Sequence, residues 1–281
     1  MYNVSSFITT DKQSASQEKR MSICLTSNGF SFSVVADGAV LLSFGTVDIE
    51  LRRPLYELTA DIKSVFSSCN ISTLDMRSME LVLPAESFVW VPAVVYDVAQ
   101  RRAYLEAVGR VPSDCTVCSV FDSAVDAHLV FAVPDHLLTA FKVALPGIDV
   151  CAVPYKLANA GLLQRSSSHP LIVAHLSEAR DGKEVNVDYM AANNGRMLLS
   201  VRRSVSDNRQ LLRLSLDIMK QLGIEQADLE LLLCGAVDRE IYGALCNYFP
   251  HVDLYNGQPY SFVNPEFRHL HTYRHVLNLV D

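Results

Sequence analysis

Cys115 and Cys118 have the Cys-x-x-Cys spacing that can support thiol chemistry. A redox pair of this kind needs a helix N-terminus to lower the thiol pKa, and a zinc site needs a second pair close in sequence. Here the pair lies in a strand-like run, in which residues three apart point to opposite faces, and the sequence has no second pair nearby. We therefore expect both residues to be core thiols.

Three histidines, His269, His271 and His275, lie close together in the C-terminal region. On a helix, His271 and His275 would share a face and form a candidate ligand pair. The glutamate of the His-Glu-x-x-His metal motif is missing between them, so we expect a polar helix face. The sequence also contains no Gly-x-Ser-x-Gly elbow, Gly-x-Gly-x-x-Gly loop or Walker A motif. We predict no catalytic residue and no metal site.

Composition and charge narrow the class of protein. The 281 residues are 49% hydrophobic and 20% charged, which is too apolar for a chain that is disordered throughout. The formal net charge of −7 argues against a nucleic-acid partner, because such binding requires neutralisation of phosphates. The longest strongly apolar stretch, residues 88–96, is about half as long as a membrane span, and the polar N-terminal segment lacks the apolar core of a signal peptide. We expect a cytoplasmic protein with reduced cysteines.

The predicted elements begin with a polar tail over residues 1–20 and continue with a meander of three strands. Alternating apolar residues flank Asn28-Gly29, a strong hairpin signal, and a helix begins after Pro54, where apolar residues recur at helical spacing. The later elements of this half are a buried strand at 79–83, a helix opened by Pro92, strands at 115–121 and 128–133, a helix at 135–145, a strand at 148–153 and a short helix at 155–163.

A serine-rich segment, residues 164–170, is the best linker candidate, and the same order of elements begins again after it. Turns at Asp181-Gly182 and Asn194-Gly195 separate three strands. The elements of this half are strands at 171–176, 184–191 and 196–202, an amphipathic helix capped by Ser206 or Asp207 and ended by Gly223, a buried strand at 229–233, a helix at 238–249, a strand at 252–255 and a helical segment at 265–280.

This repeated plan predicts an α/β fold with two domains, residues 21–165 and residues 166–281. Three antiparallel strands followed by parallel strands with crossover helices give, in each domain, a mixed five-stranded sheet with helices on both faces.

The repeated plan resembles the ribonuclease H-like unit, and two such units in tandem resemble the actin-like ATPase fold. Over residues 21–281 the chain is similar to an uncharacterised family of Bacteroidetes proteins with a degenerate form of that fold. The residues that carry the resemblance are the stretch at 91–97, Val-Pro-Ala-Val-Val-Tyr-Asp, and Val133-Pro134.

The resemblance implies a test of function, because working actin-like ATPases clamp nucleotide phosphates with two turns of the type Asp-x-Gly. In the first turn Ser27 replaces the acid, while Asn28 and Gly29 follow it. The second turn is longer and has Arg180 two residues before its glycine. The strand that would lie beneath adenosine ends in one glycine instead of two. The resulting candidates for a cleft site are Ser27, Asn28, Gly29, Ser177, Asp181, Gly182 and Gly235.

Two functions follow from these features. The first is a non-catalytic protein-interaction or scaffold module, a pseudoenzyme without a cofactor and with a protein partner that the sequence does not name. The second is a nucleotide-binding protein or weak kinase that uses a rebuilt cleft between the domains, and only this alternative involves ATP and Mg²⁺. The missing acids favour the first function, because a metal–phosphate site needs carboxylates that face the ion.

Overall fold

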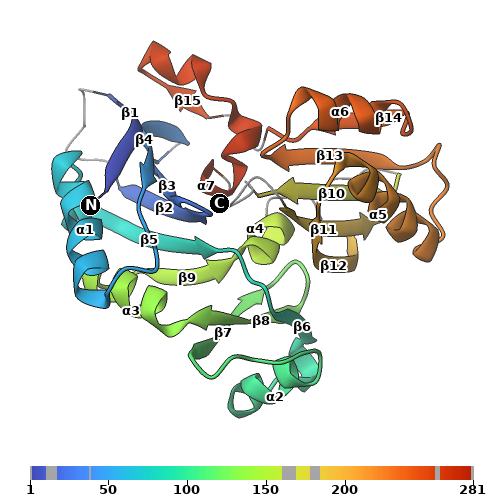
Figure 1. The fold of residues 1–281 in the computed structure, drawn as a ribbon, viewed down its shortest axis with the longest axis horizontal. Coiled ribbons are helices and arrows are strands. Elements are labelled where there is room, and N and C mark those ends of the chain that lie inside the picture. Colours follow the sequence, from blue (N-terminus) through green and yellow to red (C-terminus); the bar gives the residue numbers. More distant parts are fainter. Residues whose placement is uncertain are drawn as a thin grey trace.

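The computed structural model of the chain describes residues 2–10, 18–37, 39–159, 169–177, 184–256 and 260–279. Its elements form two large sheets, a smaller third sheet and helices that pack against them (Figure 1). The turn at Asp181-Gly182 and most of the predicted linker lie outside the described residues. Within the described residues, no helix has the length and apolar character needed to cross a membrane.

The first sheet has seven strands, where the sequence predicted five. Its order is β1-β4-β3-β2-β5-β9, and β15 pairs with β4 beside this path. The bounds are β1 (Asn3–Thr9), β2 (Lys19–Thr26), β3 (Gly29–Ala36), β4 (Val40–Asp48), β5 (Met76–Leu83), β9 (Asp149–Ala152) and β15 (Ser261–Phe262).

Both faces of the first sheet are covered. Phe30 and Phe32 of β3 point into the main core, together with Leu58 and Ile62 of α1 (Leu55–Ser68) and Phe141 of α3 (Asp135–Ala144). The alternate residues of β3 face α7 (Val276–Leu279) on the opposite side, because successive side chains of a strand point to opposite faces. A 3-10 turn (Thr73–Asp75) leads from α1 into β5.

The second sheet has five strands in the order β12-β11-β10-β13-β14. The bounds are β10 (Leu171–Leu176), β11 (Val185–Asn193), β12 (Arg196–Val205), β13 (Glu230–Gly235) and β14 (His251–Leu254). Helices α5 (Asn208–Gln221) and α6 (Arg239–Cys246) share a core with one face. Asp207 and Asp238 cap these helices by accepting backbone N–H bonds from Gln210 and Ile241.

Helix α4 (Val153–Asn159) packs on the other face of the second sheet. Its residues Val153 and Leu157 share a core cluster with Val173 and Met190 of that sheet and with Val82 of the first. This cluster joins the two sheets.

The five strands β4-β3-β2-β5-β9 and the five strands of the second sheet have the same order and sense. In each group the first two pairings are antiparallel and the last two are parallel. The chain therefore has a mixed α/β fold in which one order of pairing occurs twice.

A third sheet, β6-β8-β7, lies between β5 and α3 in the sequence. It consists of β6 (Phe88–Pro92), β7 (Cys115–Asp122) and β8 (Ala127–Pro134), with α2 (Arg101–Glu106) packed against it. The helix predicted to begin at Pro92 is wrong in its first part. Pro92 ends β6, and two 3-10 turns (Ala93–Val95 and Val98–Gln100) come before α2.

Both ends of the described chain join the first sheet. The predicted polar tail is wrong over residues 3–9, because these residues form β1, which pairs with β4. The C-terminal segment was predicted as one helix of the second half. It contains 3-10 turns (Pro265–His269 and Thr272–Arg274) and α7, and it returns to β4, β2 and β3 of the first sheet.

Candidate functional site

A cleft of about 1060 Å³ is lined by residues of both large sheets and, along one side, by residues of β7 and β8 of the third sheet. Four of the seven residues predicted from sequence line it: Ser27 and Asn28 in the turn after β2, Ser177 after β10, and Gly235 at the end of β13. Asp181 and Gly182 lie outside the described residues. The strand ends that the sequence analysis singled out in the two halves therefore meet at one cleft.

Gly29 and Gly235 are required by the backbone of the protein itself. A Cβ on Gly29 (φ +155°) would lie 2.0 Å from the Val47 carbonyl oxygen, and a Cβ on Gly235 (φ +82°) would lie 2.0 Å from the Leu176 carbonyl oxygen. Both glycines allow neighbouring strands to approach closely at the cleft. A substitution at either position would disturb the strand ends, so it would not test ligand binding alone.

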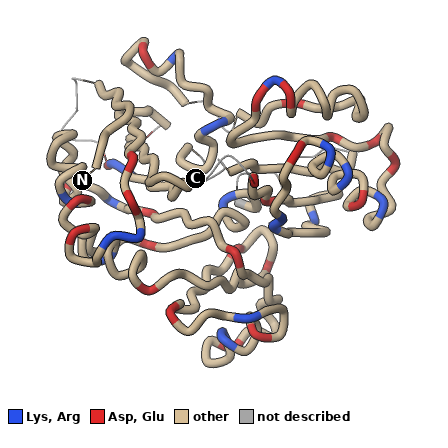
Figure 2. The backbone as a smooth tube through the Cα atoms, in the orientation of Figure 1, with Lys and Arg blue, Asp and Glu red and all other residues tan. Residues whose placement is uncertain are grey.

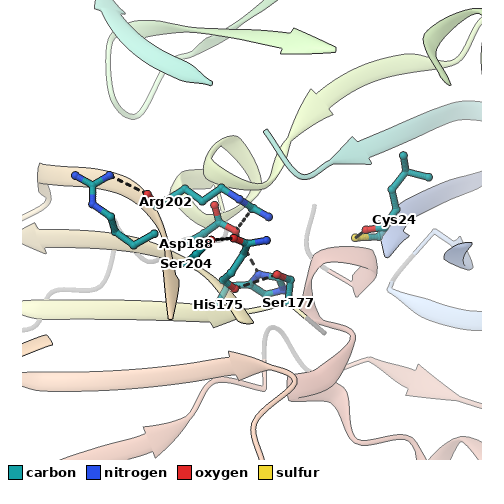
Figure 3. A network of polar contacts seen from close by, with 9 residues as sticks. Cys24, His175, Ser177, Asp188, Arg202 and Ser204 are labelled. Carbon is teal, nitrogen blue, oxygen red and sulfur yellow. Dashed lines mark hydrogen bonds and ion pairs between the residues drawn. The ribbon is translucent and has the colours of Figure 1, made fainter. Parts of the chain in front are cut away.

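The second sheet presents an ionic row of side chains to the cleft, which we call the second-sheet row: His175, Asp188 and Arg202. Strand register places Asp188 opposite both His175 and Arg202. Arg202 Nη1 donates to Asp188 Oδ2 at 2.6 Å, and His175 Nδ1 lies 3.8 Å from the same oxygen (Figure 3). Asp188 is only 1% exposed. All three residues line the cleft.

A second polar row, Ser177, Asn186 and Ser204, lies two residues further along the same strands. Ser177 Oγ donates to the Asn186 carbonyl oxygen at 2.9 Å, and Ser204 Oγ donates to Asn186 Oδ1 at 2.5 Å. This outer row is more exposed than His175 and Asp188. Of these six polar residues, only Ser177 was predicted from the sequence as a site residue.

The first sheet presents a neutral row to the same cleft, which we call the first-sheet row: Cys24, Ser31 and Thr46. Burial raises the pKa of the Cys24 thiol to about 12, so this group stays protonated at neutral pH. Ser31 Oγ donates to Asn278 Oδ1 of α7 at 2.6 Å, and Asn278 Nδ2 donates to the Ser31 and Ser22 carbonyl oxygens. The C-terminal helix therefore occupies the Ser31 hydroxyl, the central polar group of this row.

An ion pair joins α4 to β5, with the lysine buried and the glutamate partly exposed. Lys156 Nζ donates to Glu80 Oε2 at 2.7 Å, and Cys151 Sγ donates to Glu80 Oε1 at 3.2 Å. Burial, followed by the charge of Glu80, raises the pKa of Cys151 well above its ordinary value. This pair fixes α4 on β5 and does not line the cleft.

Two of the other chemical candidates from the sequence, Cys115 and His275, also line the cleft, whereas Cys118 does not. Cys115 and Cys118 are free thiols in β7, and burial raises the pKa of both. His275 follows a 3-10 turn and lies against the Phe44 ring, with 4.5 Å between ring centroids. Burial, then Arg274 and His271, lower its pKa to about 4. Within the described residues, no group of three or more His, Cys, Asp or Glu side chains is placed to hold a metal ion.

Comparison with solved structures identifies the class of fold. The chain is similar to a Bacteroides thetaiotaomicron protein with an actin-like ATPase fold and unknown function, with a TM-score of 0.70, 18% identity, and 92% of this chain and 96% of that chain covered. It is also similar to the ethanolamine utilization protein EutJ from Carboxydothermus hydrogenoformans, with a TM-score of 0.50, 5% identity, and coverage of 97% of this chain and 92% of that chain. The protein therefore has an actin-like ATPase fold.

The family follows from the sequence. Residues 9–252 match the family described as Protein of unknown function (DUF3822), and the chain belongs to this family. A search of curated proteins gives no significant match.

Proposed function

We propose that this protein is a non-catalytic binding module, in which two ribonuclease H-like units hold a small molecule in the cleft between them. The observation that carries this proposal is the cleft itself, because the predicted strand ends of both halves line it and a polar floor belongs to the second sheet. Ligands commonly bind in concave sites that are formed between two packed units.

The side chains at the strand ends argue against metal-dependent ATP hydrolysis. The end of β2 and its turn carry Thr26 and Ser27, and the end of β10 carries His175 and Ser177. None of these supplies a carboxylate to organise Mg²⁺ and the attacking water. We therefore propose binding without a resident metal, and nucleotide remains one candidate for the ligand.

Thermal unfolding with added ligand tests this proposal. A ligand at 100 times its Kd stabilises the folded protein by about 2.7 kcal/mol, so ATP, ADP, Mg-ATP and adenosine can be compared directly. Ala236→Trp places a large ring in the cleft lining and should abolish any stabilisation. Ala227→Trp, on an exposed loop outside the cleft, is the matched control.

Two results would contradict the proposal. One is hydrolysis of Mg-ATP by the unaltered protein, measured as released phosphate, that is absent in Ala236→Trp. The cleft would then be catalytic. The other is a stabilising ligand whose effect survives Ala236→Trp, since the cleft would then not be its site.

A protein-interaction or scaffold role is the second candidate, and the third sheet favours it. Val94, Val95 and Val98, in the two 3-10 turns before α2, are 92%, 60% and 59% exposed. Apolar residues gathered in this way are typical of protein contacts. Charged residues, by contrast, are spread along the whole described chain (Figure 2).

Affinity purification with surface variants tests this second role. A protein that co-purifies with the tagged chain should be lost in Val94→Asp with Val98→Asp. It should be retained in Val143→Asp, which changes an exposed valine of α3. Equal recovery with both variants would remove the third sheet as the contact.

A further inference from the structure

The second-sheet row contains two polar atoms that no described residue satisfies. Asp188 Oδ1 and His175 Nδ1 are both buried, and neither has a hydrogen-bond partner within the part of the chain that the structure describes. The other Asp188 oxygen already accepts from Arg202. Buried polar groups are almost always paired, and an unpaired one costs free energy. A partner for these atoms is therefore expected, and both residues line the cleft (Figure 3).

The charges of the row limit which partner fits. The Arg202 guanidinium neutralises the Asp188 carboxylate, and the side chains are 9% and 1% exposed. An added phosphate would place negative charge beside Asp188, and an added ammonium would place positive charge beside Arg202. Either would leave an uncompensated charge in a desolvated site. A neutral ligand group that donates a hydrogen bond to Asp188 adds no charge, so the Asp188 carboxylate and the Arg202 guanidinium still neutralise each other.

The number of polar groups indicates several hydrogen bonds. Asp188 Oδ1 accepts only, because an ionised carboxylate has no donor, and a neutral histidine nitrogen donates or accepts according to its tautomer. Ser177 and Asn186 of the outer row also line the cleft and add a hydroxyl and an amide at the more exposed side of the floor. Hydroxyl groups, which both donate and accept, match this arrangement.

We propose that the His175–Asp188–Arg202 floor of the cleft binds a neutral, hydroxyl-rich small molecule, with one ligand hydroxyl donating to Asp188 Oδ1 and a neighbouring hydroxyl hydrogen-bonded to His175 Nδ1. The inference rests on the proposed function of the cleft and names its ligand class. A free sugar and the ribose of a nucleoside share this chemistry.

Calorimetric titration with four compounds tests the ligand class. D-ribose represents a free sugar and adenosine a nucleoside, while 2′,3′-dideoxyadenosine lacks the neighbouring hydroxyls and ATP adds charge. We expect ribose or adenosine to bind, and the dideoxy compound and ATP to bind at least tenfold more weakly. Asp188→Asn should weaken binding at least tenfold, because it replaces a charged acceptor by an amide. Asp253→Asn, on exposed β14, should leave the affinity unchanged.

Nitrogen NMR of histidine in the unaltered chain gives a readout that does not depend on the folding of a variant. Binding should shift the His175 ring resonances and leave those of exposed His251 in place. Binding of ribose or adenosine without a shift at His175 would overturn the inference. ATP stabilisation that is lost in Ala236→Trp but kept in Asp188→Asn would also overturn it while leaving the proposed function intact. No response to any compound would overturn both.

Discussion

The first-sheet row and the second-sheet row occupy corresponding strands but differ in chemistry. The first-sheet row is small and neutral, and α7 covers its central serine. The second-sheet row is ionic and retains unpaired polar atoms at the cleft. One order of strand pairing thus supports two different surfaces. The backbone plan therefore sets where the cleft lies, and the cross-strand side chains decide which of the two rows offers unpaired polar atoms to a ligand.

Removal of the Asp188 carboxylate should give the largest effect on stability. Asp188→Ala leaves the Arg202 guanidinium desolvated without its ion-pair partner, and we expect a loss of about 3–5 kcal/mol in the free energy of unfolding, measured by urea denaturation. Asp253→Ala, in an exposed position of the same sheet, should change it by less than about 0.5 kcal/mol. Equal effects of the two variants would show that the ion pair of Asp188 with Arg202 does not stabilise the second-sheet row.

A change of pH should act on the side of the cleft that contains His275. Its pKa is about 4 in the folded protein and 6.5 in the unfolded chain, so the unfolded state binds more protons between these values. The contribution of His275 to the free energy of unfolding is therefore fully present above pH 6.5. It decreases as the pH falls from 6.5 to 4 and does not change further below pH 4. His275→Phe keeps a ring against Phe44 and should remove about 3 kcal/mol of this dependence.

The measurement is urea denaturation of both proteins across this pH range. The difference between them isolates His275, because the remaining groups titrate in both. Parallel pH profiles would contradict its burial as a neutral group.

Loss of the amide that covers the first-sheet row should have a smaller effect. Asn278→Ala removes one bond accepted from Ser31 and two donated to carbonyl oxygens, and we expect a loss of about 2 kcal/mol by urea denaturation. Asn256→Ala is the control, because Asn256 is exposed, and its side chain donates to the Leu254 carbonyl oxygen and accepts from Thr272 Oγ1 at the surface. If both variants unfold at the same urea concentration, α7 does not stabilise this row.

The smallest expected effect concerns the reactivity of the Cys24 thiol, which should be nearly inert to alkylation in the folded protein. Cys24 is buried and its pKa is about 12, whereas Cys246 is exposed. At mildly alkaline pH we expect an alkylating reagent to label Cys24 at least about 100 times more slowly than Cys246, followed by mass spectrometry. Denatured protein, in which both label, is the control. Fast labelling of native Cys24 would show that this row opens to solvent.

Local sequence signals predicted most of the elements. Asn28-Gly29 and Asn194-Gly195 do join adjacent antiparallel strands, and Asp207 does cap α5. The failures are long-range. β1 is a polar segment held by pairing with a strand about forty residues away, where Ser5 and Ser6 hydrogen-bond to Thr46. Nothing in its own pattern distinguishes such a strand from a polar tail.

The candidate site was predicted only in part, because some of its residues follow from local motifs and others depend on long-range strand pairing. Turn residues such as Ser27 and Asn28 can be found from local motifs, but the second-sheet row depends on strand register. Counting from the Asn194-Gly195 turn would pair Asp188 with Val201. A bulge that leaves Leu198 unpaired shifts the register by one residue, so Arg202 lies opposite instead. The one local signal in the sequence was Asp188 itself, because an acidic residue within the apolar run at 187–190 is unusual and indicates a functional or ion-paired position.

The return of residues 260–279 to the first sheet has a consequence for synthesis on the ribosome. Ser31 and Asn278 are 247 positions apart, and β15 pairs with β4 across a similar span. Contacts between distant positions form slowly because a long loop must close first. Strands β2, β3 and β4 therefore leave the ribosome with one face uncovered, and that face is covered only after residues 260–279 have been translated.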